Sequence, residues 1–233
     1  MTVVEHLTEL RRRMIISIVA VAVAALVVYI FSLQIIDFLI DYYREATDGD
    51  RDALVFTGPL DAFTTRLKVA TYGGIVLAVP VWLWQLWRFI TPGLNPNEKR
   101  YAVPFIVASM ALFALGGFVA MRTLEPALGF LLGQGGSELE PLLTADKYLS
   151  LVTLMILAFG VAFELPVVLV FLLIARVVTT GQLSRARRWA ILGVTIFAAV
   201  ITPSQDPYSM LLLAVPMYLF YELSIIIGKI IKR

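Results

Sequence analysis

The sequence predicts an all-α, polytopic membrane protein with six transmembrane helices, and both its composition and its patterning support this fold class. Apolar residues make up 60% of the 233 residues, whereas soluble domains contain about 45–50% even when glycine is counted. The mean hydropathy of the chain is +0.86. Because a helix needs about 20 mostly apolar residues to cross a hydrocarbon core of about 30 Å, the recurring apolar stretches indicate repeated crossings.

Six apolar stretches define the expected helices, and together they make residues 1–233 a single transmembrane domain. The expected spans cover approximately residues 14–33, 67–90, 101–124, 148–175, 189–201 and 208–228. The last two are short and are separated by the helix-breaking run from Thr202 to Pro207. A helix over 189–201 covers only about 20 Å, and such a mismatch is relieved by local thinning of the bilayer or by packing against a partner.

Lys and Arg are distributed unequally between the two sides of the membrane, and this asymmetry predicts the orientation. One side carries 13 of the 19 basic residues, namely Arg11, Arg12, Arg13, Arg88, Lys99, Arg100, Arg176, Arg185, Arg187, Arg188, Lys229, Lys232 and Arg233. The other side carries 12 of the 17 acidic residues, chiefly in two expected outer loops, 34–66 and 123–147. Since basic residues accumulate on the cytoplasmic side, we expect both termini in the cytoplasm.

The composition excludes several classes of function. The chain contains no Cys and only one His, so thiol nucleophiles, thiolate metal sites and histidine metal clusters are ruled out. An intramembrane protease lacks its residues, because we find no pair of membrane-embedded aspartates and no convincing Ser/His arrangement. A net charge of +2 is too small to indicate a nucleic-acid partner. We therefore expect no enzyme, no catalytic residues, no metal and no cofactor.

Glu164 is the most informative single residue. It lies about 15 residues into the fourth expected span, or roughly 22 Å along a helix, and acids at such depth usually face a protein interior or a wet cavity. Pro166 cannot donate a backbone N–H, so the helix should kink beside the acid. The structural alternative is a neutral acid that hydrogen-bonds a neighbouring helix. A proton- or ion-coupled secondary transporter, with Glu164 as its intramembrane site, is the alternative function.

The cytoplasmic face carries few acids among its many bases. Glu9 lies three and four residues before Arg12 and Arg13, so local ion pairing explains it without a function. Glu98 is followed directly by Lys99 and Arg100, and charge pairing on a solvated face explains it equally well. Glu222, in the last span, is close enough to the inner surface for its carboxylate to reach water. From the residues alone, a structural explanation is favoured for all three.

Four segments together resemble the TatC family, the polytopic subunit of the twin-arginine protein translocase. They are Glu5-His6-Leu7-Thr8-Glu9-Leu10-Arg11-Arg12-Arg13, Phe89-Ile90-Thr91-Pro92-Gly93-Leu94 running on to Glu98-Lys99-Arg100, Phe159-Gly160-Val161-Ala162-Phe163-Glu164-Leu165-Pro166, and Ile201-Thr202-Pro203 to Asp206-Pro207 leading into Ala214-Val215-Pro216-Met217-Tyr218. Each segment alone is modest. In this order and spacing they are specific, and the resemblance covers essentially the whole chain.

The resemblance implies a concave, glove-like bundle in a prokaryotic cytoplasmic membrane that acts as a signal-peptide receptor. It implies export of folded proteins with the proton-motive force, together with single-span partners of the TatA and TatB type, in a larger oligomeric complex. The residues matching the family's signal-peptide surface are Glu9, Leu10, Arg11, Phe89, Pro92 and Glu98. Those matching its partner-helix region are Glu164, Pro166, Thr202, Asp206 and Met210.

At one position the sequence departs from the family pattern. The family commonly has Gln where this chain has Met210. Methionine offers only a weak acceptor, so a polar contact with a partner is not expected at this position.

Overall fold

The computed structural model describes residues 3–46, 54–90, 102–133, 143–202 and 207–231. Within these ranges the chain is helical, and its helices are α1 (Val3–Ile30), α2 (Ser32–Ala46), α3 (Asp61–Leu77), α4 (Val79–Ile90), α5 (Ala102–Gly133), α6 (Ala145–Ala162), α7 (Leu165–Ile174), α8 (Thr180–Arg185), α9 (Arg187–Ile201) and α10 (Pro207–Ile230). The one isolated β-bridge that the described residues show joins Val55 to Thr144. The predicted all-α fold class is confirmed.

Several helices are long and apolar enough to cross a membrane. Four candidates are continuous or nearly so, at Val4–Ile30, Val103–Leu131, Ala145–Ile174 and Pro207–Ile230. A fifth combines α3 and α4, which are bent by 49° at Ala78. Pro80 follows this bend in the first turn of α4 and accounts for it, because proline cannot donate an N–H to the preceding turn. α9 has only 15 residues and is not among these candidates, so the short fifth span expected from the sequence stays a prediction.

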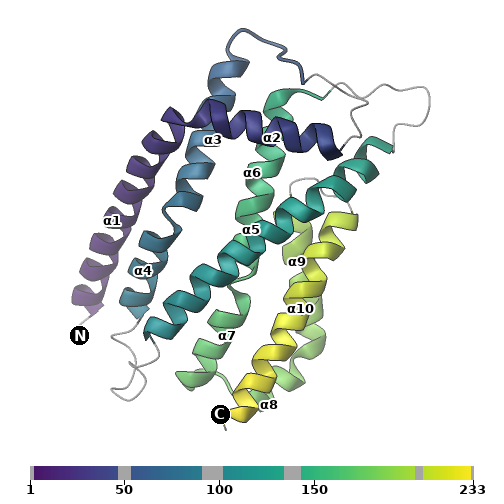
Figure 1. The fold of residues 1–233 in the computed structure, drawn as a ribbon. Helices are drawn as coiled ribbons and strands as arrows, with labels where there is room; N and C mark the ends of the chain where they lie inside the picture. Colours follow the sequence, from purple (N-terminus) through teal and green to yellow (C-terminus); the bar gives the residue numbers. More distant parts are fainter. Residues whose placement is uncertain (1–2, 47–53, 91–101, 134–142, 203–206, 232–233) are drawn as a thin grey trace.

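A break in the helix beside Glu164 is also present. α6 ends at Ala162 and α7 begins at Leu165, and Pro166 lies in the first turn of α7. The chain continues in the same general direction across the break, so α6 and α7 together traverse the molecule (Figure 1). The break therefore sets Glu164 at the middle of a crossing segment.

α2 is a helix that the sequence analysis placed in an outer loop. It passes across α3 and α6 near their outer ends (Figure 1), with Leu39 and Tyr43 buried. Two tyrosines fasten it: the Tyr42 hydroxyl donates to the Met121 carbonyl at 2.6 Å, and the Tyr148 hydroxyl donates to the Leu39 carbonyl at 2.7 Å. The outer cap of the molecule thus includes a docked amphipathic helix.

α6 forms the centre of the core. Its residues Tyr148, Leu149, Val152, Met155 and Phe159 are at most 1% exposed. On one side α5 approaches α6 so closely that a Cβ on Gly116 would lie 2.5 Å from the Phe159 carbonyl oxygen. Small residues at such crossings allow backbones to come together, which is how helices associate inside a membrane.

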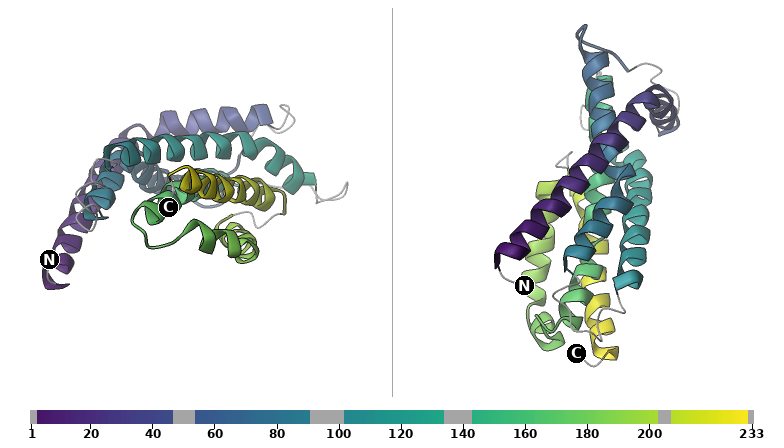
Figure 2. Two further views of the ribbon diagram at one scale, coloured as in Figure 1. Left: turned by 90° about the horizontal axis from the view of Figure 1, so that it is seen from below. Right: turned by 90° about the vertical axis from the view of Figure 1, so that its left-hand side faces the viewer.

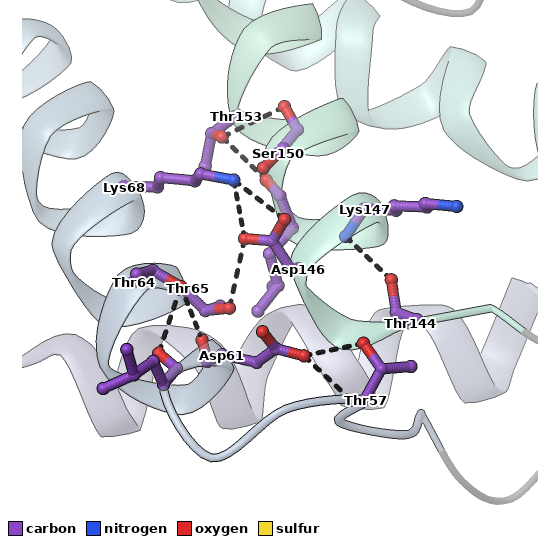
Figure 3. Close-up of polar contacts among 12 residues, drawn as sticks. Thr57, Asp61, Thr64, Thr65, Lys68, Thr144, Asp146, Lys147, Ser150 and Thr153 are labelled. Carbon is purple, nitrogen blue, oxygen red and sulfur yellow. Dashed lines mark hydrogen bonds and ion pairs between the residues drawn. The ribbon is translucent and has the colours of Figure 1, made fainter.

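Polar contacts join α3 to α6 at the outer end of the molecule (Figure 3). Lys68 donates to both carboxylate oxygens of Asp146 at 2.8 Å, and Thr144 caps the start of α6 by accepting from the Lys147 N–H. The Asp61 carboxylate accepts from the backbone N–H groups of Thr57 and Gly58 and so shapes the entry to α3.

The helices follow a curve when the molecule is viewed along its long axis (Figure 2, left), with α1 at one end of the curve and α9 toward the other. The start of α1 and the end of α10 lie at the same end of the molecule (Figure 1). One side of the wall is therefore concave, and the segments carrying the expected inner-face residues gather at one end.

Candidate functional site

The inner ends of α1 and α4 are joined by a short polar chain. Arg13 donates to one oxygen of Glu9 at 2.8 Å and to the side-chain oxygen of Gln85 at 2.9 Å. The pairing of Glu9 with Arg13, four residues later in α1, is the one expected from the sequence spacing. Gln85 was not anticipated, since an uncharged side chain near the end of an apolar span gives little signal. The chain of three residues positions the Glu9 carboxylate on α1.

This polar chain is only partly satisfied. The side chains of Glu9 and Arg13 are 18% and 17% exposed. The second carboxylate oxygen of Glu9 is buried and has no hydrogen-bond partner among the described residues, and the same holds for Nε of Arg13. Buried polar atoms without partners are unfavourable and are rare in native structures. The Glu9 carboxylate therefore has one oxygen that the described residues leave unpaired.

An apolar groove adjoins the Glu9–Arg13 pair. It has a volume of about 390 Å³. Its lining comes from α1 and α4 and consists of Leu10, Arg13, Met14, Ser17, Ile18, Trp82, Gln85, Leu86 and Phe89. The ring of Phe89 stacks on His6 with centroids 4.4 Å apart. A carboxylate beside an apolar groove can hold a peptide that carries arginine next to apolar residues.

The structure brings together three of the six expected signal-peptide residues. Leu10 and Phe89 line the groove and Glu9 reaches it through Arg13. Arg11 is exposed and does not line the groove. Pro92 and Glu98 lie outside the described residues.

Glu164 occupies the break between α6 and α7 and connects two environments. Its carboxylate is hydrogen-bonded by the side chain of Ser109, a fully buried residue of α5. Ser109 in turn accepts a hydrogen bond of 3.0 Å from the indole N–H of Trp87 on α4. This chain of hydrogen bonds was missed by sequence reasoning, because a serine within an apolar helix does not indicate which helix it faces.

The other side of Glu164 faces a cavity. Oε1 is buried and has no partner among the described residues. The cavity has a volume of about 400 Å³ and is lined by Val161, Ala162, Glu164, Leu165, Val168, Gly193, Val194, Phe197 and Met217. These residues come from the α6–α7 break, from the short helix α9 and from α10. A polar acceptor thus meets an apolar cavity, which is an arrangement suited to a hydrogen-bonding group carried by another membrane helix.

The remaining residues of the expected partner region differ in accessibility. Thr202 ends α9, is 1% exposed, and donates to the Ala198 carbonyl at 2.6 Å. Its direct contribution is therefore to the end of this helix. Met210 is half-buried and packs against the main core, while Pro166 is buried in α7. Asp206 lies outside the described residues.

Glu222 is fully engaged within the chain. Arg187 binds both of its oxygens, at 2.7 and 2.8 Å, and the Tyr218 hydroxyl donates to it at 3.0 Å. This bidentate pair joins the start of α9 to α10. The structural interpretation of Glu222 is the one that the geometry supports.

Comparisons with known proteins agree with this architecture. The family model described as "Sec-independent protein translocase protein (TatC)" matches residues 5–216. The chain is 45% identical to the Sec-independent protein translocase protein TatC of Frankia casuarinae, covering 100% of this chain and 67% of that protein. It is 41% identical to the TatC of Magnetococcus marinus, covering 99% and 84%, and 37% identical to that of Carboxydothermus hydrogenoformans, covering 100% and 94%.

A solved structure supports the same relationship. The crystal structure of a twin-arginine translocase receptor, TatC, superposes with a TM-score of 0.84 at 36% identity, covering 98% of this chain and 100% of the other. Sequence match and fold match thus extend over nearly the whole molecule. The chain belongs to the TatC family of Sec-independent protein translocase proteins.

Proposed function

We propose that this protein is the signal-peptide receptor and core subunit of a twin-arginine translocase that exports folded proteins with the proton-motive force. Family membership supports a role in protein translocation, which is not an enzymatic activity. It does not favour the alternative of an ion-coupled secondary transporter. The distribution of Lys and Arg supports insertion in a prokaryotic cytoplasmic membrane with both termini in the cytoplasm.

The observation that carries this proposal is that only one of the two carboxylate oxygens of Glu9 accepts a hydrogen bond from the described residues. One oxygen pairs with Arg13, and the second is buried without a partner beside the apolar groove. Guanidinium groups bind carboxylates through paired N–H donors, so an arginine of a signal peptide can supply what Glu9 lacks. Glu98, on the segment that joins α4 to α5, is the second carboxylate in this proposal. Leu10, Arg11, Phe89 and Pro92 complete the surface.

A TatC protein works with other components of the translocase. We propose that these components are single-span proteins of the TatA and TatB type, and that they place a helix against the cavity of Glu164. Pro166, Thr202, Asp206 and Met210 are assigned to the same partner region by their match to the family. Met210 is apolar and packs against the core. The polar contact with a partner helix is therefore assigned to Glu164.

Binding of synthetic signal peptides to the purified protein tests the receptor role. Glu9→Ala and Glu98→Ala should each weaken binding of an Arg-Arg peptide by roughly ten- to a hundredfold, because a hydrogen bond to a charged group contributes about 1.5–3 kcal/mol. A Lys-Lys peptide, which cannot bind in the bidentate mode, should lose much less. Glu5→Ala, one turn earlier in α1, is the matched control and should leave both affinities unchanged. Equal losses for both peptides would contradict the proposal.

A further inference from the structure

A third cavity lies in the outer half of the molecule, away from both sites described above. It has a volume of about 830 Å³ and lies beneath α2, between α3 and α5. Its lining residues are Val27, Val28, Phe31, Ile35, Phe38, Leu39, Tyr42, Val69, Tyr72, Gly73, Val76, Leu77, Phe118, Met121, Arg122, Thr153 and Ile156. None of them lines the groove of Glu9 or the cavity of Glu164.

The cavity opens toward lipid and is almost entirely apolar. Phe31, Phe38, Leu77 and Phe118 line it and are each more than half exposed. The polar groups that face it are few, and two of the hydroxyls are already engaged, since Tyr42 donates to Met121 and Thr153 to Leu149. The polar groups left for a ligand are the Tyr72 hydroxyl and the Arg122 guanidinium. An apolar space of this kind does not hold water.

Arg122 is the one charged residue of the lining. It lies 20 residues after Ala102, the start of α5, and therefore about 30 Å further along that helix. Because α5 is tilted (Figure 1), its neighbour Met121 is the better guide to depth: the Met121 carbonyl accepts from Tyr42 of α2, so the guanidinium lies toward the outer end of the molecule. It stands 5.5 Å from the ring centroid of Phe118, and no carboxylate of the described residues pairs with it.

We propose that this cavity binds a phospholipid of the outer leaflet, with its phosphate on Arg122 and an acyl chain in the apolar space below. Arg122 lies toward the outer end, whereas Leu77 and Ile156 lie toward the middle of the molecule, so the lining runs in the direction of a lipid chain. The Tyr72 hydroxyl, lower in the cavity, is placed to donate to a lipid ester oxygen. A second protein helix fits less well, because three turns of a helix about 11 Å wide occupy roughly 1,500 Å³.

The charge of Arg122, and not the apolar contact, sets the selectivity of this site. Acyl chains leave an equally apolar environment when they enter the cavity, so burial alone gives little preference over bulk lipid. The phosphate–guanidinium pair is charge-assisted and close to apolar surface, where such pairs are strong. A zwitterionic lipid carries the same phosphate but also brings a cation beside Arg122, so the site should prefer a lipid of net negative charge, and the bound chain should fill the space between α2 and the bundle.

Native mass spectrometry of the purified chain, released from nanodiscs of equal phosphatidylglycerol and phosphatidylcholine, tests the proposal. The wild type should retain phosphatidylglycerol several-fold over phosphatidylcholine. Val27→Trp, which fills the cavity from α1, should abolish retention, whereas Val23→Trp, on the same helix but outside the lining, should not. Arg122→Gln should bring the ratio of the two lipids close to one, whereas Lys147→Gln, which removes an exposed outer charge, should leave it unchanged.

Three results would overturn the assignment. Retention of both lipids in equal amounts by the wild type, or an unchanged ratio in Arg122→Gln, would remove the headgroup site. Undiminished retention in a folded Val27→Trp would place the lipid elsewhere. Displacement of the lipid by a single-span partner helix would make the cavity a protein interface. Because Arg122 is exposed, its substitution leaves the fold intact and keeps the test valid if Val27→Trp does not fold. The lipid measurement uses no signal peptide. A failure of the receptor proposal would therefore appear only in the peptide-binding experiment and not in this one.

Discussion

Three glutamates of this chain differ in how many of their acceptor oxygens are used. Glu222 is bound at both oxygens by Arg187. Glu9 and Glu164 each have one oxygen that is buried without a partner among the described residues, and each adjoins a cavity. An unmet acceptor is unfavourable in the free protein, so binding of a donor ligand recovers free energy at these two positions and not at Glu222.

Substitution of Glu164 tests whether a neutral hydrogen-bonding group is enough. Glu164→Gln keeps a polar group of the same shape that can bind Ser109, whereas Glu164→Ala removes it. We expect Gln to retain much of the export activity and Ala to lose it, together with contact to the partner helix. Because the chain contains no Cys, a single cysteine at Val161, an exposed residue of the cavity lining, reports that contact by disulfide cross-linking to a second cysteine placed in the partner helix, with an added oxidant.

The control for Glu164 is the inner site, where binding of the signal peptide should be unchanged in both variants. If Gln is as inactive as Ala while folding and peptide binding are preserved, ionisation of the acid is required. That result would exclude a simple hydrogen-bonding anchor.

At the scale of helices, close packing of α5 on α6 depends on Gly116 and not on its neighbour Gly117. A methyl group on Gly116 would meet the Phe159 carbonyl at 2.5 Å, whereas on Gly117 its nearest neighbour is Ile156 Cγ2 at 3.4 Å. Gly116→Ala should therefore lower stability by about 1–3 kcal/mol through overpacking. Gly117→Ala should be neutral or stabilising by up to about 1 kcal/mol, because alanine favours helix.

Thermal unfolding of the two glycine variants in detergent, followed by tryptophan fluorescence, measures this difference. The variants add the same methyl group one position apart, so any general effect of helix propensity is shared. Equal midpoints for Gly116→Ala and Gly117→Ala would show that α5 can move away from α6 without loss.

The helices were predictable where apolar length or proline determines them, and not where tertiary contacts do. The break at Glu164 followed from Pro166, and Pro80 carried an equal but unused signal for the bend between α3 and α4. α2 was assigned to a loop because its acidic residues interrupt the apolar pattern of its buried face. Its docking through Tyr42 and Tyr148 also depends on contacts between residues far apart in the sequence.

The candidate sites divide in the same way. Charged residues are conspicuous in an apolar chain, so Glu9 and Glu164 could be selected from the sequence. Their neutral partners Gln85 and Ser109 could not, because a neutral side chain reveals its role only when the helix that it faces is known. The lipid cavity likewise arises from four helices and the cap, and no segment of the sequence contains its pattern.

For the whole molecule, the short helix α9 is the feature that acts on the surrounding membrane. Its 15 residues extend about 22 Å, against a hydrocarbon core of about 30 Å. Exposed apolar side chains on α9, at Ile191, Ile196 and Val200, face outward, so lipid must adapt to this helix. α1, with 28 residues, imposes no such limit at the opposite end of the curved wall.

We therefore expect the bilayer to be thinner beside α9 than beside α1. Mismatch costs a fraction of a kcal/mol per Å when the lipid deforms, which is small enough for the membrane to yield by several Å. Electron cryomicroscopy of the protein in lipid nanodiscs measures the headgroup spacing around its perimeter, and the dip should be local to α9 and the Glu164 cavity beside it. Such thinning would shorten the apolar path that a translocated segment has to cross at this place. A uniform spacing around the whole perimeter would instead mean that α9 is shielded from lipid by tilting or by a partner.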